Sequence, residues 1–208
     1  MNLRRLASDR RRLTAYWSAT AVQVAAVALD VKFLREASKF SLMPLLLSWT
    51  RSRQAHPLLQ AALLASAAGD LLLETRFELA GIAAFAAAHA CYLAFFAGRS
   101  TARDWRVLAA YAALWAALIA ALSPGLGNQR LPVAAYALLL TATAVVSRWH
   151  SPRAGLGGLL FLISDALIAY RMSGRDFHGR SALTMSTYAA GQYFLTSSRT
   201  PERRPRTP

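Results

Sequence analysis

Residues 57–73 read PLLQAALLASAAGDLLL, an apolar stretch of near membrane-spanning length that carries one carboxylate, Asp70, close to its end. Residues 158–170 read GLLFLISDALIAY and carry a second carboxylate, Asp165. A carboxylate at bilayer depth is costly unless it is neutralised or partnered, so each Asp is a functional-site hypothesis by default. The alternative is that each Asp only bonds a neighbouring helix or lies nearer the headgroups. Two such residues favour a shared site.

The composition indicates the class of protein. Hydrophobic residues make up 55% of the 208 residues and charged residues only 16%, which is far more apolar material than a soluble domain of this size needs for its core. Arginines gather at both ends and in short runs between apolar blocks, as loops between membrane helices do. The predicted fold class is all-α, a polytopic membrane protein with eight transmembrane helices.

The predicted spans are separated by polar, Pro-containing or Gly-containing breaks such as His56-Pro57 and Ser151-Pro152. They cover residues 13–29, 37–49, 57–73, 77–98, 105–122, 131–147, 154–170 and 181–197. The second contains Lys39 and Pro44 and is short, so it is predicted as a spanning helix with a re-entrant or broken segment as the alternative. We expect one transmembrane domain over 13–198, a basic segment over 1–12 and a disordered basic tail over 199–208.

The positive charges predict the orientation. Lys and Arg number 16 on the side of the two ends and 7 on the other, so both termini are expected in the cytoplasm. Arg outnumbers Lys 22 to 2 and Ala is abundant, a bias typical of a GC-rich bacterial genome, so we expect a bacterial inner (cell) membrane. Anionic membrane lipids account for the net charge of +14, and with no basic soluble domain we expect no nucleic-acid partner.

Several kinds of catalytic centre are disfavoured by missing motifs. The sequence has no HxxxH or HExxH pair, so no metal site is predicted. It has no GxSxG elbow for a serine hydrolase. Cys91 is alone and mid-helix, which favours a packing role over a thiolate site.

A set of polar residues can be placed by depth. Counted from the ends of their spans, Lys39, Asp70, Asp165 and Tyr188 fall in one half of the bilayer, opposite the termini. The residues His89, Tyr92 and Gln192 fall deeper, where they can line the floor of the same cavity. Each has an ordinary structural alternative, such as a hydrogen bond to a neighbouring helix. Together with two carboxylates they favour a buried polar pocket.

Three stretches carry a family resemblance across nearly the whole chain. They are GDLLLETRFELAGIAAFAAAHACYLAFF from Gly69, GGLLFLISDALIAY from Gly157, which includes Ser164, and YAAGQYF from Tyr188. In order and separation they resemble the YhhN family of lysoplasmalogenase-like membrane proteins. The family's Lys-Pro region is similar to the segment at Lys39, although here Pro44 follows five residues later.

The resemblance implies eight transmembrane helices and hydrolysis of the vinyl ether bond of lysoplasmalogens, which are lysophospholipids. The products are a fatty aldehyde and glycerophosphoethanolamine or glycerophosphocholine. Protonation of the outer vinyl carbon creates an oxocarbenium ion that water captures, a task similar to that of the two carboxyls of glycosidases. Asp70 and Asp165, one protonated and one charged, are the expected catalytic pair. No metal or organic cofactor is required.

The other polar residues are expected to orient the reacting groups. Tyr188, His89 and Gln192 would position the carboxyls and water, and Lys39 could meet the lipid phosphate. Tyr92 and Ser164 are further candidates for binding or orientation. Two other classes of protein stay open: a small transporter or flippase in which the aspartates relay protons, and a non-catalytic lipid-binding protein. The physiological lipid also stays open between a lysoplasmalogen and another ether lipid or lysophospholipid.

Overall fold

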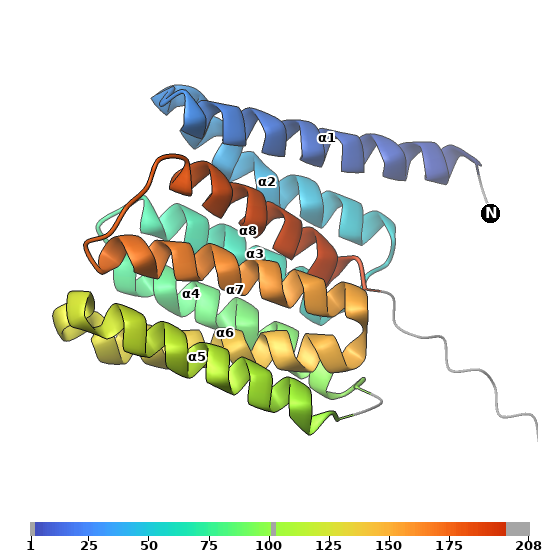
Figure 1. Cartoon of the computed structure of the whole chain (residues 1–208). Coiled ribbons are helices and arrows are strands. Elements are labelled where there is room, and N and C mark those ends of the chain that lie inside the picture. The colour runs from blue at the N-terminus through green and yellow to red at the C-terminus, as the bar shows by residue number, and fades with distance from the viewer. Residues whose placement is uncertain (1–2, 101–102, 199–208) are drawn as a thin grey trace, which may run out of the picture.

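The computed structural model describes residues 3–100 and 103–198, and helices account for nearly all of them. Neither range contains a strand, so the predicted all-α class is confirmed. The helices are α1 (Leu3–Ala28), α2 (Lys32–Ser52), α3 (Pro57–Leu73), α4 (Glu78–Ala97), α5 (Trp105–Leu126), the short 3-10 helix η1 (Gly127–Gln129), α6 (Arg130–His150), α7 (Pro152–Met172) and α8 (Arg180–Thr196) (Figure 1).

Local capping explains where several helices begin. His56 caps α3, because its Nδ1 accepts a hydrogen bond from the Leu58 N–H at 3.2 Å, and Pro57 occupies the first turn. Ser151 caps α7 in the same way, ahead of Pro152. The predicted breaks at these two dipeptides are confirmed. The bounds of α3 coincide with those predicted, since a cap and a proline mark its start.

The second helix differs from the prediction. It was expected over residues 37–49, but α2 is an unbroken helix of 21 residues that contains both Lys39 and Pro44. The hydropathy pattern missed its ends because they carry charged residues, which an extended helix places near the headgroups. A broken second segment was therefore the wrong alternative, and the crossing of the membrane by α2 stays a prediction. Similarly, α1 already includes the basic residues from Leu3 onward. The tail over 199–208 lies outside the described residues.

The helices form a ring with one helix outside it. In the order of their contacts, α1, α2, α3, α4, α6, α7 and α8 pack side by side, and α8 closes the ring by packing on α1. Helix α5 lies outside and packs mainly on α6, and Leu122 and Leu126 are its buried residues. Helix α1 begins, and α8 ends, at the same end of the bundle (Figure 1). The core lies inside the ring, where Tyr92, Phe95 and Phe96 are fully buried.

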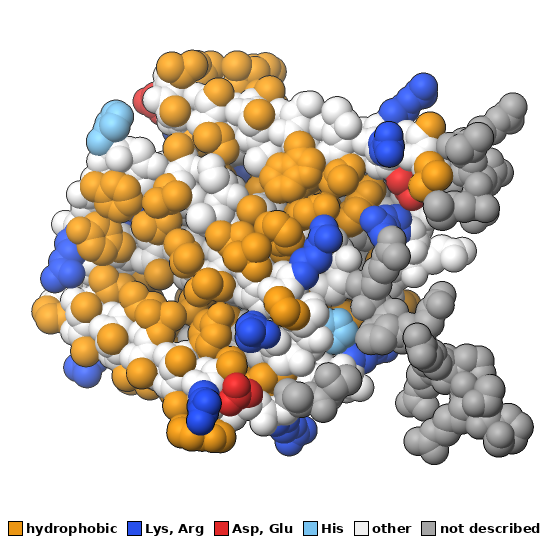
Figure 2. Space-filling view, turned by 45° about the vertical axis from the view of Figure 1, so that its right-hand side comes forward, with side chains coloured by type: hydrophobic (Ala, Val, Ile, Leu, Met, Phe, Trp, Pro, Cys, Tyr) orange, Lys and Arg blue, Asp and Glu red, His pale blue; other side chains and the backbone are white. Residues whose placement is uncertain are grey.

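Many large hydrophobic side chains are exposed on the outside of the bundle. By length and hydropathy, three helical stretches of the described residues can cross a membrane: Leu79–Ala97, Trp105–His150 and Pro152–Met172. The second of them is a hairpin, because α5 and α6 pack against each other. Hydrophobic side chains cover much of the flank seen in Figure 2. These features are those of an integral membrane protein, and the number of eight spanning helices stays a prediction.

Candidate active site

Asp70 is held by a tyrosine from the other end of the sequence. The residue lies one turn before the end of α3 and is 6% exposed. Tyr188 of α8, itself buried, donates a hydrogen bond of 2.7 Å from its hydroxyl to Asp70 Oδ2. A buried carboxyl needs such a donor, because an unpartnered one would carry its full desolvation cost. The structure therefore brings together two residues that depth alone had placed in one layer.

Asp165 has a partner that the sequence analysis missed. The hydroxyl of Tyr136, on α6, donates a hydrogen bond of 2.9 Å to Asp165 Oδ2 on α7. Both residues are half-buried. The available signal was a tyrosine more than one turn inside the predicted span 131–147, rather than at an end, where membrane tyrosines usually lie. Each of the two aspartates is thus paired with a tyrosine of a neighbouring helix.

The two carboxyl–tyrosine pairs face a common cluster of aromatic rings. The Phe161 ring lies 5.4 Å from Tyr188 and 4.5 Å from the imidazole of His89. The His89 ring lies 6.1 Å from Tyr136. The cluster therefore connects Asp70, through Tyr188, with Asp165, through Tyr136. No hydrogen bond among the described residues joins the two carboxyls directly.

His89 lies at the centre of this cluster with half of its hydrogen-bonding capacity unused. It is 1% exposed, and its Nδ1 lies 3.3 Å from the hydroxyl oxygen of Thr143 on α6. Its Nε2 is buried and has no hydrogen-bond partner among the described residues. Buried polar atoms are nearly always satisfied in proteins, so an unsatisfied one marks a place where a polar atom of water or a ligand can bind.

Tyr92, Gln192 and Ser66 form a hydrogen-bonded polar line, one helical turn from the Asp70–Tyr188 pair. The Tyr92 hydroxyl donates to Gln192 Oε1 at 2.5 Å, and Gln192 Nε2 donates to the hydroxyl of Ser66 at 2.9 Å. Ser66 was not predicted, although it precedes Asp70 by four residues and so shares its helix face. The line fixes α8 against α3 and α4, and thereby positions Tyr188, which lies one turn from Gln192.

Lys39 and Ser164 lie at the margin of the cluster. Lys39 Nζ forms an ion pair with Glu74 Oε1 at 2.5 Å, just past the end of α3 and one turn beyond Asp70. Ser164 precedes Asp165 in sequence, but its hydroxyl donates to the Thr184 carbonyl of α8 at 3.2 Å. The lysine is thus near Asp70 without contacting it, and the serine joins α7 to α8 next to Asp165.

The described residues bring no three His, Cys, Asp or Glu side chains together in a way that could hold a metal ion. They do bring together two carboxyls, those of Asp70 and Asp165, near the buried imidazole of His89. One oxygen of each carboxyl accepts a hydrogen bond from a tyrosine hydroxyl. Such groups can donate and accept protons in a space from which water is largely excluded. The arrangement is therefore suited to acid–base chemistry on an apolar substrate.

Comparison with known proteins identifies relatives. The chain is 35% identical over 142 residues to lysoplasmalogenase TMEM86B of Homo sapiens, a match that covers 68% of this chain and 62% of the human protein. It is 37% identical over 147 residues to lysoplasmalogenase TMEM86B of Rattus norvegicus, covering 68% of this chain and 60% of the rat protein. The chain thus spans about three fifths of the length of these relatives.

No solved structure matches the chain. The family model described as the YhhN family matches residues 34–199, a range that includes α3 to α8 and with them both carboxyl–tyrosine pairs. Because this match covers most of the sequence, the chain belongs to the YhhN family.

Proposed function

We propose that this protein is a lysoplasmalogenase-like ether hydrolase that cleaves the vinyl ether bond of lysoplasmalogens inside the membrane. The observation that carries the proposal is the meeting of two carboxyl–tyrosine pairs, Asp70–Tyr188 and Asp165–Tyr136, on one aromatic cluster within the helix ring. The names of the relatives from Homo sapiens and Rattus norvegicus agree with this activity.

The reaction needs one acid and one anion. A protonated carboxyl donates its proton to the outer vinyl carbon, and the double-bond electrons form the new C–H bond while the ether oxygen shares the positive charge. Water then adds to the carbon next to that oxygen and gives up a proton to a carboxylate. The hemiacetal hydroxyl then gives its proton to a carboxylate, its oxygen forms the C=O bond of the fatty aldehyde, and the C–O bond to glycerol breaks as the glycerol oxygen takes up a proton from a carboxyl. Asp70 and Asp165 act as a coupled pair in these transfers.

The neighbours of the carboxyls act through position. Tyr188 and Tyr136 each hold one carboxyl oxygen, and in this proposal the other oxygen of each Asp serves the proton transfers. The Nε2 atom of His89 offers a hydrogen bond to the attacking water. Rings such as Phe161 surround the alkenyl chain with apolar surface, which keeps bulk water from the oxocarbenium ion.

Lys39 serves the lipid headgroup in this proposal. Its side chain is only 16% exposed, while that of Glu74 is 46% exposed, so the ion pair lies at the border of the site. A phosphate that arrives beside Lys39 would compete with Glu74 for the ammonium group. The headgroup would then lie at the end of α3, and the vinyl ether bond would reach toward Asp70, one turn deeper.

The proposal includes the finer membrane topology. All eight helices cross the membrane, both termini face the cytoplasm, and the membrane is a bacterial inner membrane. Two observations support this orientation: α1 begins and α8 ends at one end of the bundle, and most arginines belong to that end.

A transport function is the alternative class, and the polar line from Asp70 toward Tyr92 is what favours it. That line ends inside the bundle at apolar rings. The Tyr92 ring stacks on Phe96, with the ring centroids 6.4 Å apart, and Phe96 and Phe95 are both fully buried. A proton or ion path would need further polar groups beyond this point. Hydrolysis is therefore the better account of the site.

The test is aldehyde release by the purified protein from alkenyl lysophosphatidylethanolamine, run beside the acyl-linked lysolipid. Wild type should release aldehyde, and Asp70→Asn and Asp165→Asn should each lose turnover while keeping the melting temperature. The matched control is Asp104→Asn, the same chemical change at the N-cap of α5, where an amide oxygen still accepts the Arg106 N–H. Full activity in either site variant would remove that residue from the mechanism, and no release by wild type would overturn the proposed reaction.

A further inference from the structure

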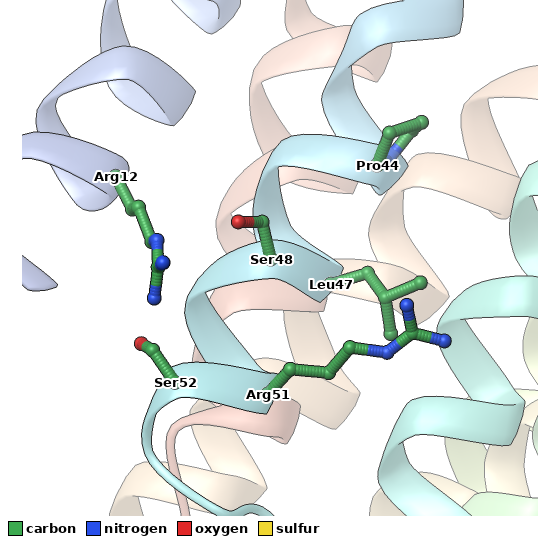
Figure 3. A pocket seen from close by; sticks show the side chains of 6 residues that line it. All are labelled: Arg12, Pro44, Leu47, Ser48, Arg51 and Ser52. Carbon is green, nitrogen blue, oxygen red and sulfur yellow. The ribbon is translucent and has the colours of Figure 1, made fainter.

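A hollow lies between α1 and α2 at the end of the bundle where α1 begins (Figure 3). Its volume is about 520 Å³, enough for a phospholipid headgroup. The residues that line it come from the two helices: Arg12, Pro44, Leu47, Ser48, Arg51 and Ser52. No residue of the carboxyl–tyrosine pairs contributes to it.

The hollow combines positive charge with hydroxyl groups. Figure 3 shows the Arg12 guanidinium extending from α1 toward the hydroxyls of Ser48 and Ser52 on α2, while Arg51 lies beside Leu47. Neither arginine forms an ion pair with any acidic side chain of the described residues. The Arg12 guanidinium and the Ser48 hydroxyl are donors of the kind with which proteins bind phosphate oxygens, whereas the Ser52 hydroxyl already donates to Asp9.

One carboxylate, that of Asp9 on α1, lies nearby. The Ser52 hydroxyl donates to Asp9 Oδ1 at 2.5 Å. This bond ties the start of α1 to the end of α2 and fixes one wall of the hollow. Arg12 is half-buried and lines the hollow, so its guanidinium is available to an anion that enters there.

The hollow is too far from the carboxyls to hold the headgroup of the substrate. Arg51 follows Lys39 by twelve residues on the same helix, which corresponds to about 18 Å along the axis. Lys39 lies at the Asp70 end of the bundle, so the hollow opens at the opposite membrane surface. A lipid bound there is a second molecule from the other leaflet.

The apolar part of the lining indicates a lipid rather than a free anion. Pro44 and the buried Leu47 continue the hollow along α2 toward the middle of the bundle, where hydrocarbon surrounds the helices. A phosphate held by Arg12 and Ser48 would thus place its acyl chains along an apolar strip. We propose that this hollow binds the phosphate headgroup of an anionic phospholipid, which joins α1 to α2 at the arginine-rich end of the bundle.

Native mass spectrometry of the full chain in neutral detergent tests this proposal. The probes are dioleoyl phosphatidylglycerol, dioleoyl phosphatidylcholine and inorganic phosphate. The double variant Arg12→Gln/Arg51→Gln should bind phosphatidylglycerol about tenfold more weakly than wild type, as expected when charge-assisted hydrogen bonds are lost. The control Arg103→Gln/Arg106→Gln makes the same charge change at exposed positions around the start of α5 and should bind as wild type does.

A second variant leaves the charge unchanged. Ser48→Trp, at an exposed position of the lining, fills the hollow and should also abolish the preference for phosphatidylglycerol over phosphatidylcholine. Equal losses in the control and the test variants would mean general attraction to basic surface and would overturn the site. Binding of inorganic phosphate as tight as that of the lipid would overturn the assignment to a phospholipid. Aldehyde release by these variants is expected to persist, so the outcome does not depend on the proposed reaction.

Discussion

Removing the two tyrosine hydroxyls separately should affect turnover to different extents. Tyr188→Phe deletes the 2.7 Å bond to Asp70, and Tyr136→Phe deletes the 2.9 Å bond to Asp165. A hydrogen bond to a charged group contributes about 1.5–3 kcal/mol, with the upper part of this range expected where both partners are buried. Tyr188 and Asp70 are 4% and 6% exposed, whereas Tyr136 and Asp165 are only half-buried.

These differences give a ranking. If each tyrosine orients its carboxyl in the transition state, Tyr188→Phe should lower kcat/KM about a hundredfold and Tyr136→Phe about tenfold. Both variants keep the aromatic ring, so packing on Phe161 and His89 is preserved. The control is Tyr111→Phe on the outer helix α5, whose hydroxyl has no hydrogen-bond partner among the described residues.

The assay is steady-state aldehyde release from alkenyl lysophosphatidylethanolamine in detergent, with a thermal melt of each variant. Equal kcat/KM in wild type and Tyr136→Phe would refute the proposed role of Tyr136 in orienting Asp165. An equal loss in Tyr111→Phe would show that phenol removal acts through general destabilisation. A reversed ranking would refute the use of burial to scale the two effects.

The remaining predictions concern packing, pH and metals. Gly157→Ala would place a Cβ 2.6 Å from a backbone nitrogen of α8 and should cost about 1–3 kcal/mol of stability in a denaturation assay, whereas Gly98→Ala, with its nearest contact at 3.7 Å, should be neutral. Partial burial and a neighbouring arginine lower the pKa of His56 below its ordinary 6.5. The unfolded chain therefore binds a proton at His56 more readily than the folded chain does. The stability that neutral His56 contributes is complete at pH values above the ordinary pKa of 6.5, and it is lost as the pH falls through the lowered pKa of the folded state. His56→Asn, which still caps the Leu58 N–H, should flatten the acid-side fall in melting temperature, and an unchanged slope would contradict this. Treatment with EDTA should leave aldehyde release unaltered, since the described residues offer no three-ligand cluster, and recovery of lost activity by zinc would contradict the metal-free site.

Much of the fold could be predicted because it is encoded locally. A segment within hydrocarbon must satisfy its backbone hydrogen bonds internally, so apolar runs such as 57–73 predict helices, and dipeptides such as His56-Pro57 predict their starts. The same reasoning failed at α2, where charged ends lengthen the helix beyond the apolar run. Charge near a helix end is compatible with the headgroup region, and hydropathy alone does not separate it from a loop.

The candidate site also has a part that the sequence predicted and a part that it did not. The sequence alone determined that Asp70 and Asp165 lie within apolar helices, because position along a helix follows from counting residues. Only the tertiary structure decided that Tyr188 holds one carboxyl across 118 residues of sequence, and that Tyr136, which no motif singled out, holds the other. Such pairs depend on the order in which helices surround the core and on the rotation of each about its axis. The order and the rotation of the helices are set by packing between segments that lie far apart in the sequence. A local sequence pattern contains no information about that packing.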